Sequence, residues 1–188
     1  YIAKPKTHYG KSKLLAEQYI LSKKTTVNKK VFILRPCMIH GPENKGNLNL
    51  LYKLISSKIP WILGSFDNKR SYCSIDNLLF IIKELIENKK IESGIYNIAD
   101  DEPLSTNDVI VLIAKSLNRK PIIFNISKKL IFFLAKLGDV IKLPLNSEKL
   151  SKLTNSYVVS NKKILNQIGK PLPISSRNGI LKTFISFK

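Results

Sequence analysis

Hydrophobic residues are distributed along this chain in two patterns. Some recur at the spacing of a helix, and others form short continuous runs. Over 7–23 the apolar residues recur near helical spacing and Thr7 stands where a cap is needed, so we expect a helix there. The run 31–36, VFILRP, is apolar, β-branched and ended by a proline, which is typical of a buried parallel strand.

The rest of the chain continues this alternation. Asp76 is expected to cap the helix that follows it, and Ser105 and Asp108 have the spacing of a capping box. The segment 37–47, rich in Gly, Pro and Asn, predicts a loop. Further helices are predicted over 48–57, 76–90, 105–118, 127–142, 160–168 and near the C-terminal end, and further strands over 94–100, 121–126 and 157–159.

Strands that alternate with helices indicate an α/β protein with a parallel sheet component. The length of 188 residues is enough for one large or two small domains. No glycine-rich phosphate loop of the Gly-x-Gly-x-x-Gly type occurs in the sequence. By itself, therefore, this chain lacks a dinucleotide-binding fingerprint.

Apolar runs and cysteines narrow the class further. The run LIFFLAKLGDVI is interrupted by Lys136 and Asp139 and falls short of the roughly 20 residues that a membrane span needs, so no transmembrane segment is expected. Cys37 and Cys73 lie in unrelated contexts and predict no disulfide, which fits a reducing cytoplasm. The two histidines lie far from any carboxylate cluster, and we expect no metal site.

The formal net charge is +19, from 32 Lys and Arg against 13 Asp and Glu. Such a charge is compatible with a solvated lysine-rich surface, with attraction to anionic ligands or anionic membranes, and with nucleic-acid binding. The lysines are scattered over the predicted helices, and aromatic residues do not alternate with them. We therefore favour the solvated surface and expect no specific nucleic-acid partner.

The candidate chemistry lies at Tyr9 and Lys13, in the stretch YGKSK. Four residues apart on a helix, the two side chains share one face with Cβ atoms roughly 5–6 Å apart. A nearby ammonium stabilises the phenolate form of a tyrosine, which can then take a proton from a sugar hydroxyl while hydride leaves the same carbon. The motif alone is weak, because chance often produces it.

Four segments together resemble the extended short-chain dehydrogenase/reductase superfamily in their order and spacing. They are YGKSKLLAEQ, VFILRPCMIHGP, NKRSYCSIDNL and GIYNIADDEPLSTNDVI. The resemblance is closer to the NAD-dependent epimerase/dehydratase family, which acts on nucleotide sugars. It covers nearly the whole chain, and the tail from LTNSYVV onward also looks like the C-terminal segment of that family.

The resemblance implies the C-terminal part of a Rossmann-type parallel sheet joined to a small α/β substrate-binding domain. Residues 1–35 and 71–99 would complete the NAD(P)-binding domain, and 36–70 with 100–188 would form the nucleotide-sugar domain. In the family the glycine-rich loop, several strands and a catalytic Ser or Thr precede the Tyr-x-x-x-Lys helix. We therefore expect a C-terminal fragment that needs the N-terminal Rossmann portion as its partner and is inactive alone.

The resemblance also implies roles for individual residues. Tyr9 would be the acid/base, and Lys13 would activate it and hold the ribose of bound NAD or NADP. Arg70 would grip the diphosphate of a UDP-sugar, since a guanidinium forks onto phosphate oxygens. Asn47 would contact the diphosphate or the sugar, and a helix N-cap is a compatible second role.

Three residues at the end of the 31–36 strand and directly after it complete the implied site. Pro36, Cys37 and Met38 would pass near the nicotinamide and the sugar ring, with Cys37 as a packed residue and not a nucleophile. His40 stands where the family usually has tyrosine in a Tyr-Gly-Pro segment. We interpret this histidine as structural.

The implied activity is hydride chemistry at C4 of a UDP-hexose or UDP-N-acetylhexosamine, as an epimerase or a 4-ketoreductase of surface polysaccharide synthesis. A dehydratase of the same superfamily, a non-catalytic nucleotide-sugar-binding remnant and a polyanion-binding remnant are the alternatives. Family members often dimerise through the Tyr-x-x-x-Lys helix, so a homodimer is expected. The sequence leaves the sugar and the choice between NAD and NADP open.

Overall fold

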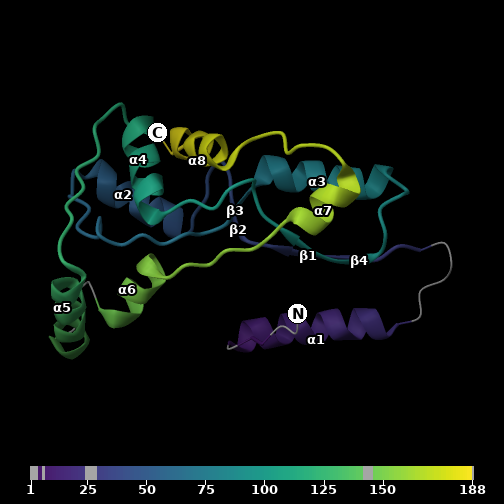
Figure 1. Ribbon diagram of the computed structural model, residues 1–188, viewed down its shortest axis with the longest axis horizontal. Helices are drawn as coiled ribbons and strands as arrows, with labels where there is room; N and C mark the ends of the chain where they lie inside the picture. Colours follow the sequence, from purple (N-terminus) through teal and green to yellow (C-terminus); the bar gives the residue numbers. More distant parts are fainter. Residues whose placement is uncertain (1–3, 6, 24–28, 142–145, 188) are drawn as a thin grey trace.

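The computed structural model describes residues 4–5, 7–23, 29–141 and 146–187 as a mixed α/β protein with parallel strands (Figure 1). These residues form eight helices and four strands. In chain order they are α1 (His8–Ser22), β1 (Phe32–Pro36), β2 (Met38–His40), α2 (Asn47–Ser56), β3 (Tyr72–Ser74), α3 (Ile75–Glu87), β4 (Gly94–Ile98), α4 (Thr106–Ser116), α5 (Lys128–Ile141), α6 (Ser147–Thr154), α7 (Lys162–Ile168) and α8 (Ser176–Ile185).

The strands form two parallel pairs. β1 lies beside β4, with Leu34 opposite Tyr96, and β2 lies beside β3, with Ile39 opposite Cys73. The parallel strand predicted over 31–36 is therefore confirmed. Strands that run parallel need a crossover connection, and helix α3 lies in the connection from β3 to β4.

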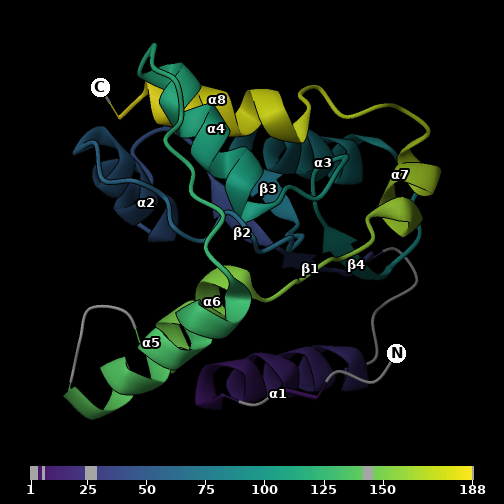
Figure 2. The same ribbon diagram turned by 60° about the vertical axis from the view of Figure 1, so that its left-hand side comes forward.

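Helices α2, α4 and α8 enclose the larger of two hydrophobic cores (Figure 2). Ile110 and Ile113 of α4 and Phe184 of α8 are fully buried in it. The ring of Tyr52 on α2 stacks on Phe184 with centroids 6.0 Å apart. Removal of these apolar side chains from water stabilises the packing of α2, α4 and α8 against one another.

The second core lies between the strands and helices α3 and α7. Ile81 of α3, Ile98 of β4 and Ile164 of α7 are fully buried there. The segment around α7 thus returns from late in the chain to cover the β1–β4 pair. Within the described ranges, no helix is both long and apolar enough to cross a lipid bilayer.

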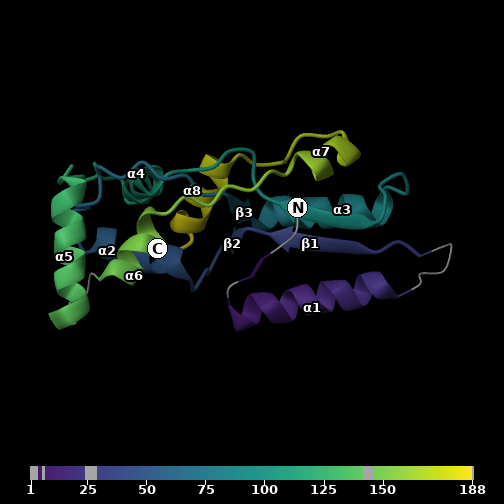
Figure 3. The ribbon, with the colours of Figure 1, turned by 60° about the horizontal axis from the view of Figure 1, so that its bottom comes forward.

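Helix α1 runs alongside β1, outside both cores (Figure 3). None of its residues is buried. Glu17 holds it to the sheet, since Arg35 of β1 donates from Nε to the two carboxylate oxygens at 2.9 and 3.2 Å and from a terminal nitrogen to one of them. Thr7 caps the helix by accepting from the Gly10 amide at 3.1 Å, as predicted.

Two helix caps test the predicted chemistry of the helix starts. The capping box of α4 is confirmed, because the Ser105 and Asp108 side chains each accept from the other residue's backbone N–H. The predicted cap at Asp76 is wrong. Ser74 caps α3 instead, and the Asp76 carboxylate pairs with Lys182 Nζ at 2.7 Å. The tertiary ion pair supplies Asp76 with a partner that the local sequence does not show.

Two predicted strands are wrong. In 121–126, Ile123 and Asn125 make only isolated bridges to the segment around residue 62, and in 157–159 Tyr157 bridges Arg70. Conversely, β2 lies inside the predicted loop 37–47, and α6 lies in a segment for which no helix was predicted. Short elements of this kind depend on distant partners, so local periodicity is a weak guide to them.

Candidate functional site

The structure brings Tyr9 and Lys13 together on one face of α1. Lys13 Nζ lies 5.5 Å from the centroid of the Tyr9 ring, and the Tyr9 side chain is 73% exposed. Gly10 between them lets the chain pass close to the helix, because a Cβ there would lie 2.8 Å from the Pro5 side chain.

A second pair of the same kind lies on the same helix. Tyr19 and Lys23 are also four residues apart, with Lys23 Nζ 4.4 Å from the ring centroid. The distance between ammonium and ring therefore does not distinguish Tyr9 from Tyr19. The two pairs differ instead in the residues and the space around them.

An open cleft of about 930 Å³ separates α1 from the ends of β1 and β4 and from the segment 157–160. Lys13 lines this cleft together with Arg35 and Pro36 of β1. Among the described residues, neither Tyr19 nor Lys23 lines it. Of the four side chains, only that of Lys13 lines the cleft, and Tyr9 lies outside the lining although its neighbour Gly10 belongs to it.

Arg70 lies beside a smaller pocket of about 230 Å³, which it lines with Met38, Tyr72 and Tyr157. Its guanidinium donates from Nε to the Asn155 carbonyl at 3.1 Å and from a terminal nitrogen to the Lys152 carbonyl. The arginine is thereby held in place at the C-terminal end of α6, with two of its three nitrogens already bonded.

Two tyrosines of this pocket differ in their surroundings. Burial raises the pKa of Tyr72 to about 12, against the opposing charge of Arg70, so its phenol stays protonated at neutral pH. Tyr157 is 63% exposed and lines both the pocket and the cleft of Lys13. No local sequence signal points to Tyr157, because its neighbours in space are set by the isolated bridge to Arg70.

Pro36, the last residue of β1, and the two residues that follow it lie in three different environments. Pro36 is exposed and lines the cleft, whereas Met38 lines the Arg70 pocket. Cys37 is half-buried against the second core, and burial, with the Asp100 charge added, raises the pKa of its thiol to about 11. A thiol in that state is a poor nucleophile at neutral pH, in line with the packed interpretation.

Asn47 is exposed at the first position of α2 and lines neither cavity. The cap of that helix is Gly46, so the N-cap role considered for Asn47 is wrong. Three of the sequence-predicted site residues line neither of the two cavities: Tyr9, Cys37 and Asn47.

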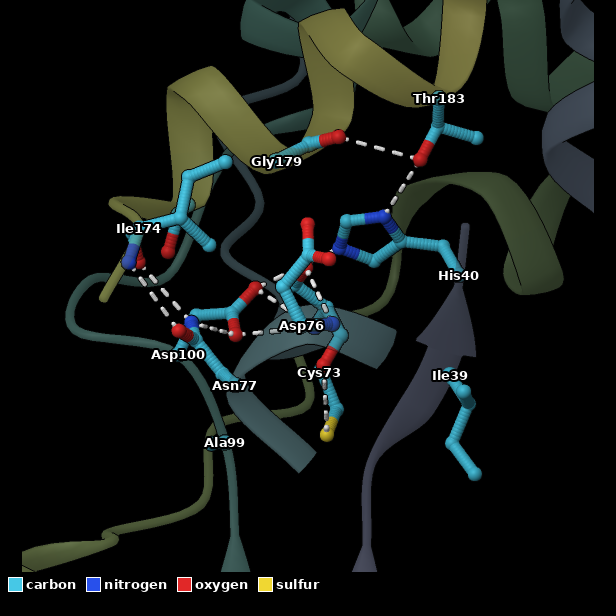
Figure 4. Close-up of polar contacts among 12 residues, drawn as sticks. Ile39, His40, Cys73, Asp76, Asn77, Ala99, Asp100, Ile174, Gly179 and Thr183 are labelled. Atoms are coloured by element: carbon cyan, nitrogen blue, oxygen red, sulfur yellow. Dashed lines mark hydrogen bonds and ion pairs between the residues drawn. The ribbon is translucent and has the colours of Figure 1, made fainter. Parts of the chain in front are cut away.

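Asp100 is the centre of a buried polar network that the sequence did not reveal (Figure 4). It accepts from the Ser74 amide at 2.9 Å and from Asn77 Nδ2 at 2.7 Å, and His40 Nε2 lies 3.3 Å from it. His40 Nδ1 lies 2.9 Å from Thr183 Oγ1. A carboxylate has no hydrogen to give, so His40 donates through Nε2. The network ties β2, β3 and α8 together, which is the structural role expected for His40.

The described residues contain no group of three or more His, Cys, Asp and Glu side chains that could hold a metal ion. For a dinucleotide, the fit is partial. Lys13 offers a donor in the lining of a roomy cleft, of the kind that a ribose hydroxyl requires, and the Tyr9 hydroxyl lies one helical turn away, outside that lining. The glycine-rich turn that would hold a dinucleotide diphosphate is missing from the sequence, so these residues fit one end of such a cofactor.

Curated proteins of known name resemble this chain over about three fifths of its length. UDP-glucose 4-epimerase of Vibrio cholerae is 33% identical over 116 residues, which are 61% of this chain and 35% of that protein. The N-acetyl-alpha-D-glucosaminyl-diphospho-ditrans,octacis-undecaprenol 4-epimerase of Escherichia coli O157:H7 is 31% identical over 118 residues, which are 62% of this chain and 36% of that protein. The matches thus span about a third of each relative.

Solved structures share the fold over almost the whole chain. UDP-glucuronic acid 4-epimerase from Bacillus cereus, in complex with NAD, has a TM-score of 0.69 at 17% identity, with 99% of this chain and 54% of that one covered. The WbmG enzyme of Bordetella bronchiseptica, also in complex with NAD, has a TM-score of 0.69 at 16% identity, with coverages of 98% and 51%. The chain spans about half of each.

The family profile that matches is that of the 3-beta hydroxysteroid dehydrogenase/isomerase family, over residues 1–123. This match covers more than half of the chain and includes the Tyr9 helix, both strand pairs and α4. The chain therefore belongs to that family and, with its epimerase relatives, to the extended short-chain dehydrogenases/reductases of the NAD-dependent epimerase/dehydratase type that its motifs predicted.

Proposed function

We propose that this chain is the C-terminal part of an NAD(P)-dependent enzyme that acts at C4 of a diphosphate-linked hexose or N-acetylhexosamine in the cytoplasm. The reaction is a 4-epimerisation or a 4-keto reduction, with a UDP-sugar as the first candidate substrate. In this proposal 1–35 and 71–99 belong to the cofactor domain, and 36–70 with 100–188 bind the sugar.

One observation carries the proposal. Of two geometrically similar Tyr–Lys pairs on α1, only the pair of Tyr9 and Lys13 has a member, Lys13, in the lining of the cleft of about 930 Å³. Tyr9 itself is exposed outside that lining, next to Gly10, which belongs to it. A proton-transferring phenol must reach its substrate within hydrogen-bond distance, so in this proposal the Tyr9 ring turns toward a sugar held beside Lys13.

In its phenolate form, Tyr9 takes the proton of the C4 hydroxyl of the sugar. It returns this proton when C4 is reduced again. Lys13 stabilises that phenolate and donates to a ribose hydroxyl of the dinucleotide. Nicotinamide chemistry supplies the hydride acceptor and donor at C4. Pro36, at the end of β1, shapes the wall of the cleft next to Lys13.

Arg70 binds the diphosphate of the substrate. In the described part of the chain, its second terminal nitrogen donates to no protein atom and is available to a phosphate oxygen. The two carbonyls that hold the rest of the guanidinium fix its direction, which favours phosphate binding because less side-chain freedom is lost. Met38 and Tyr157 form the apolar part of this pocket, and Asn47 would meet the sugar or diphosphate only if the loop before α2 moved inward.

The carrier of the sugar has two chemical candidates. The name of the Vibrio relative gives a UDP-linked sugar, and that of the Escherichia relative gives a sugar diphosphate linked to undecaprenol. Both carriers place a diphosphate next to the sugar, so Arg70 suits either one. Turnover of each substrate by the same preparation distinguishes them.

The test of the catalytic assignment compares the two Tyr–Lys pairs in the natural protein that contains this chain. Tyr9→Phe should lower kcat by roughly 10² to 10⁴, the range typical of a lost general acid/base. Tyr19→Phe is the matched control and should leave kcat within about twofold, since neither Tyr19 nor its partner Lys23 lines the cleft. Equal effects of the two substitutions, or a Tyr9→Phe enzyme with more than a tenth of its turnover, would refute the proposal.

A cofactor assay separates epimerase from reductase. A 4-ketoreductase oxidises one reduced cofactor for each sugar converted, so absorbance of the reduced nicotinamide falls in step with product. An epimerase returns the hydride to the same ring and leaves that absorbance unchanged over many turnovers. The same assay run with NADH and NADPH gives the cofactor preference.

A further inference from the structure

Helix α5 carries an apolar face that nothing in the described structure covers. Ile131, Ala135 and Gly138 are buried, which fixes the inner side of the helix. On the outer side apolar residues recur at spacings of three and four, and we call them the α5 stripe: Leu130, Phe133, Leu134, Leu137, Val140 and Ile141. All six are exposed, Phe133 to 60% and Val140 to 79%.

The inner side of α5 is anchored to the rest of the molecule. Phe132 packs edge-on against Phe66 with centroids 5.8 Å apart, and Lys128 Nζ lies 5.7 Å from the same ring. Helix α6 contacts α5. In all three ribbon views α5 lies at one end of the molecule (Figures 1, 2 and 3), and its buried Ile131 and Ala135 belong to the core that α2, α4 and α8 enclose. The stripe therefore faces outward from a fixed support.

Charge around the stripe is positive. Lys129 and Lys136, seven residues apart and both exposed, lie on the same edge of it. The acidic residue of the helix, Asp139, is turned toward α6, where its carboxylate accepts from the Ser147 amide at 2.9 Å. The chain as a whole carries a formal charge of +19. An apolar stripe edged with lysines is the pattern of a helix that lies in the interface of an anionic bilayer.

We propose that the α5 stripe seats the protein on an anionic lipid bilayer, with α5 lying in the plane of the interface. At 1.5 Å per residue the helix is about 21 Å long, too short for a hydrocarbon layer of about 30 Å. It therefore lies on the membrane with Phe133 and Val140 inserted and with Lys129 and Lys136 at the level of the lipid phosphates.

Binding of the bilayer through the α5 stripe would bring the membrane close to Arg70, the proposed diphosphate site. The C-terminal carbonyls of α6, at Lys152 and Asn155, hold the guanidinium of Arg70, and α6 packs directly on α5. A sugar diphosphate carried by a membrane lipid would thus meet Arg70 without leaving the bilayer. This second step rests on the proposed function, whereas binding to the bilayer does not.

Cosedimentation of the full natural protein with vesicles tests the seat without substrate or cofactor. The probes are vesicles of pure phosphatidylcholine and of phosphatidylcholine with phosphatidylglycerol. The test variant is Phe133→Ser/Val140→Ser. The matched control is Leu79→Ser/Ile86→Ser on α3, a pair with the same seven-residue spacing and exposures of 58% and 76%.

The expected result is binding to the anionic vesicles and at least tenfold weaker binding to the neutral ones. The α5 variant should lose at least tenfold in affinity for anionic vesicles, the α3 variant less than twofold, and Lys129→Glu/Lys136→Glu severalfold. All variants should keep the wild-type turnover of a UDP-sugar in solution.

Three outcomes would overturn the proposal. They are failure of the wild-type protein to bind anionic vesicles, wild-type binding by the α5 variant, and equal losses in the α5 and α3 variants. If sedimentation velocity showed instead that the α5 variant turns a dimer into a monomer with vesicle binding intact, the stripe would be an interface between copies. Loss of turnover in Tyr9→Phe leaves vesicle binding untouched, so the two proposals fail separately.

Discussion

Helices α1 and α4 are supported in very different ways, although both are capped at their N-termini by a hydroxyl side chain. Helix α4 buries seven of its eleven residues, and its Ile110 and Ile113 are fully enclosed. Helix α1 has fifteen residues and buries none. Leu15 and Tyr19 on α1 are 65% and 63% exposed. The first helix therefore depends on its cap and on the Glu17–Arg35 ion pair, and the other on the core.

The contrast in burial between the two helices separates the candidate catalytic residues from the part of the chain that is stabilised by the core. The candidate acid/base Tyr9 is on the helix with little packing, while α4 contains none of the proposed site residues. Helices with few buried contacts open locally at small cost in free energy, whereas core helices open only with the whole domain. In the proposed function, the cofactor domain would supply a further surface against α1.

The largest expected effect contrasts the two helices through their apolar side chains. Ile113→Ala in α4 leaves a cavity in the core and should lower the free energy of unfolding by about 2 to 5 kcal/mol. Leu15→Ala in α1 should change it by less than about 0.5 kcal/mol, because that side chain is already in water. Urea denaturation followed by circular dichroism measures both. Similar losses would mean that α1 is packed against a surface in solution.

The next contrast concerns two carboxylates. Asp100→Ala leaves the Ser74 amide buried without an acceptor and leaves Asn77 Nδ2 with the Ile174 carbonyl alone, and should lower the free energy of unfolding by about 2 to 3 kcal/mol. Glu17→Ala breaks the tie to Arg35, whose side chain is 31% exposed, and should remove less than about 1 kcal/mol.

Hydrogen exchange distinguishes the two losses. In Glu17→Ala, exchange should quicken in α1 alone, since the helix loses its contact with β1. In Asp100→Ala it should quicken across β2, β3 and α8, the elements that the network joins. A faster exchange of α4 amides in Glu17→Ala would contradict the separation of the two regions.

Smaller effects are expected from the helix caps. Ser105→Ala removes the side-chain acceptor of the Asp108 amide, keeps the backbone donor of the α4 capping box, and should lower the free energy of unfolding by about 1 kcal/mol. Thr7→Ala removes one acceptor from the Gly10 amide and should fray the first turn of α1 with little change in the global midpoint. Amide exchange at Gly10 and Asp108 measures the two caps separately. An equal shift of the urea midpoint in both variants would show that α1 is coupled to the core.

The sequence predicted the features that depend on neighbours along the chain. The helix over 7–23 and the capping box of Ser105 follow from side chains within four residues, and both are present. The Tyr9–Lys13 approach has the same local origin, since one helical turn fixes it. Local signals also reproduce Tyr19 and Lys23, however, so the sequence alone does not separate the pair whose lysine lines the cleft from the pair that lies apart from it.

Features that depend on distant neighbours were missed. His40 and Thr183 are 143 residues apart, and nothing in either local sequence announces their contact. The strand β2 forms because β3 offers a parallel partner, and α6 packs on α5 and holds Arg70. The predicted cap at Asp76 failed for the same reason, because Lys182 comes from α8. Contact between remote segments is a property of the folded core that periodicity does not encode.

The smallest expected effect is the pH dependence of the α4 cap, which acid should weaken. Burial would raise the pKa of Asp108, but hydrogen bonds from Ser105 and Arg177 outweigh it and hold the pKa below its usual range. A carboxyl whose pKa is lowered by folding stabilises the folded state above its unfolded pKa, and loses that contribution as pH falls through the lowered value. Asp108→Asn should therefore reduce the urea midpoint at pH 7 and make less difference below about pH 4. An effect that stayed constant between pH 7 and pH 3 would mean that the carboxylate charge contributes nothing and that α4 is held by its buried face alone.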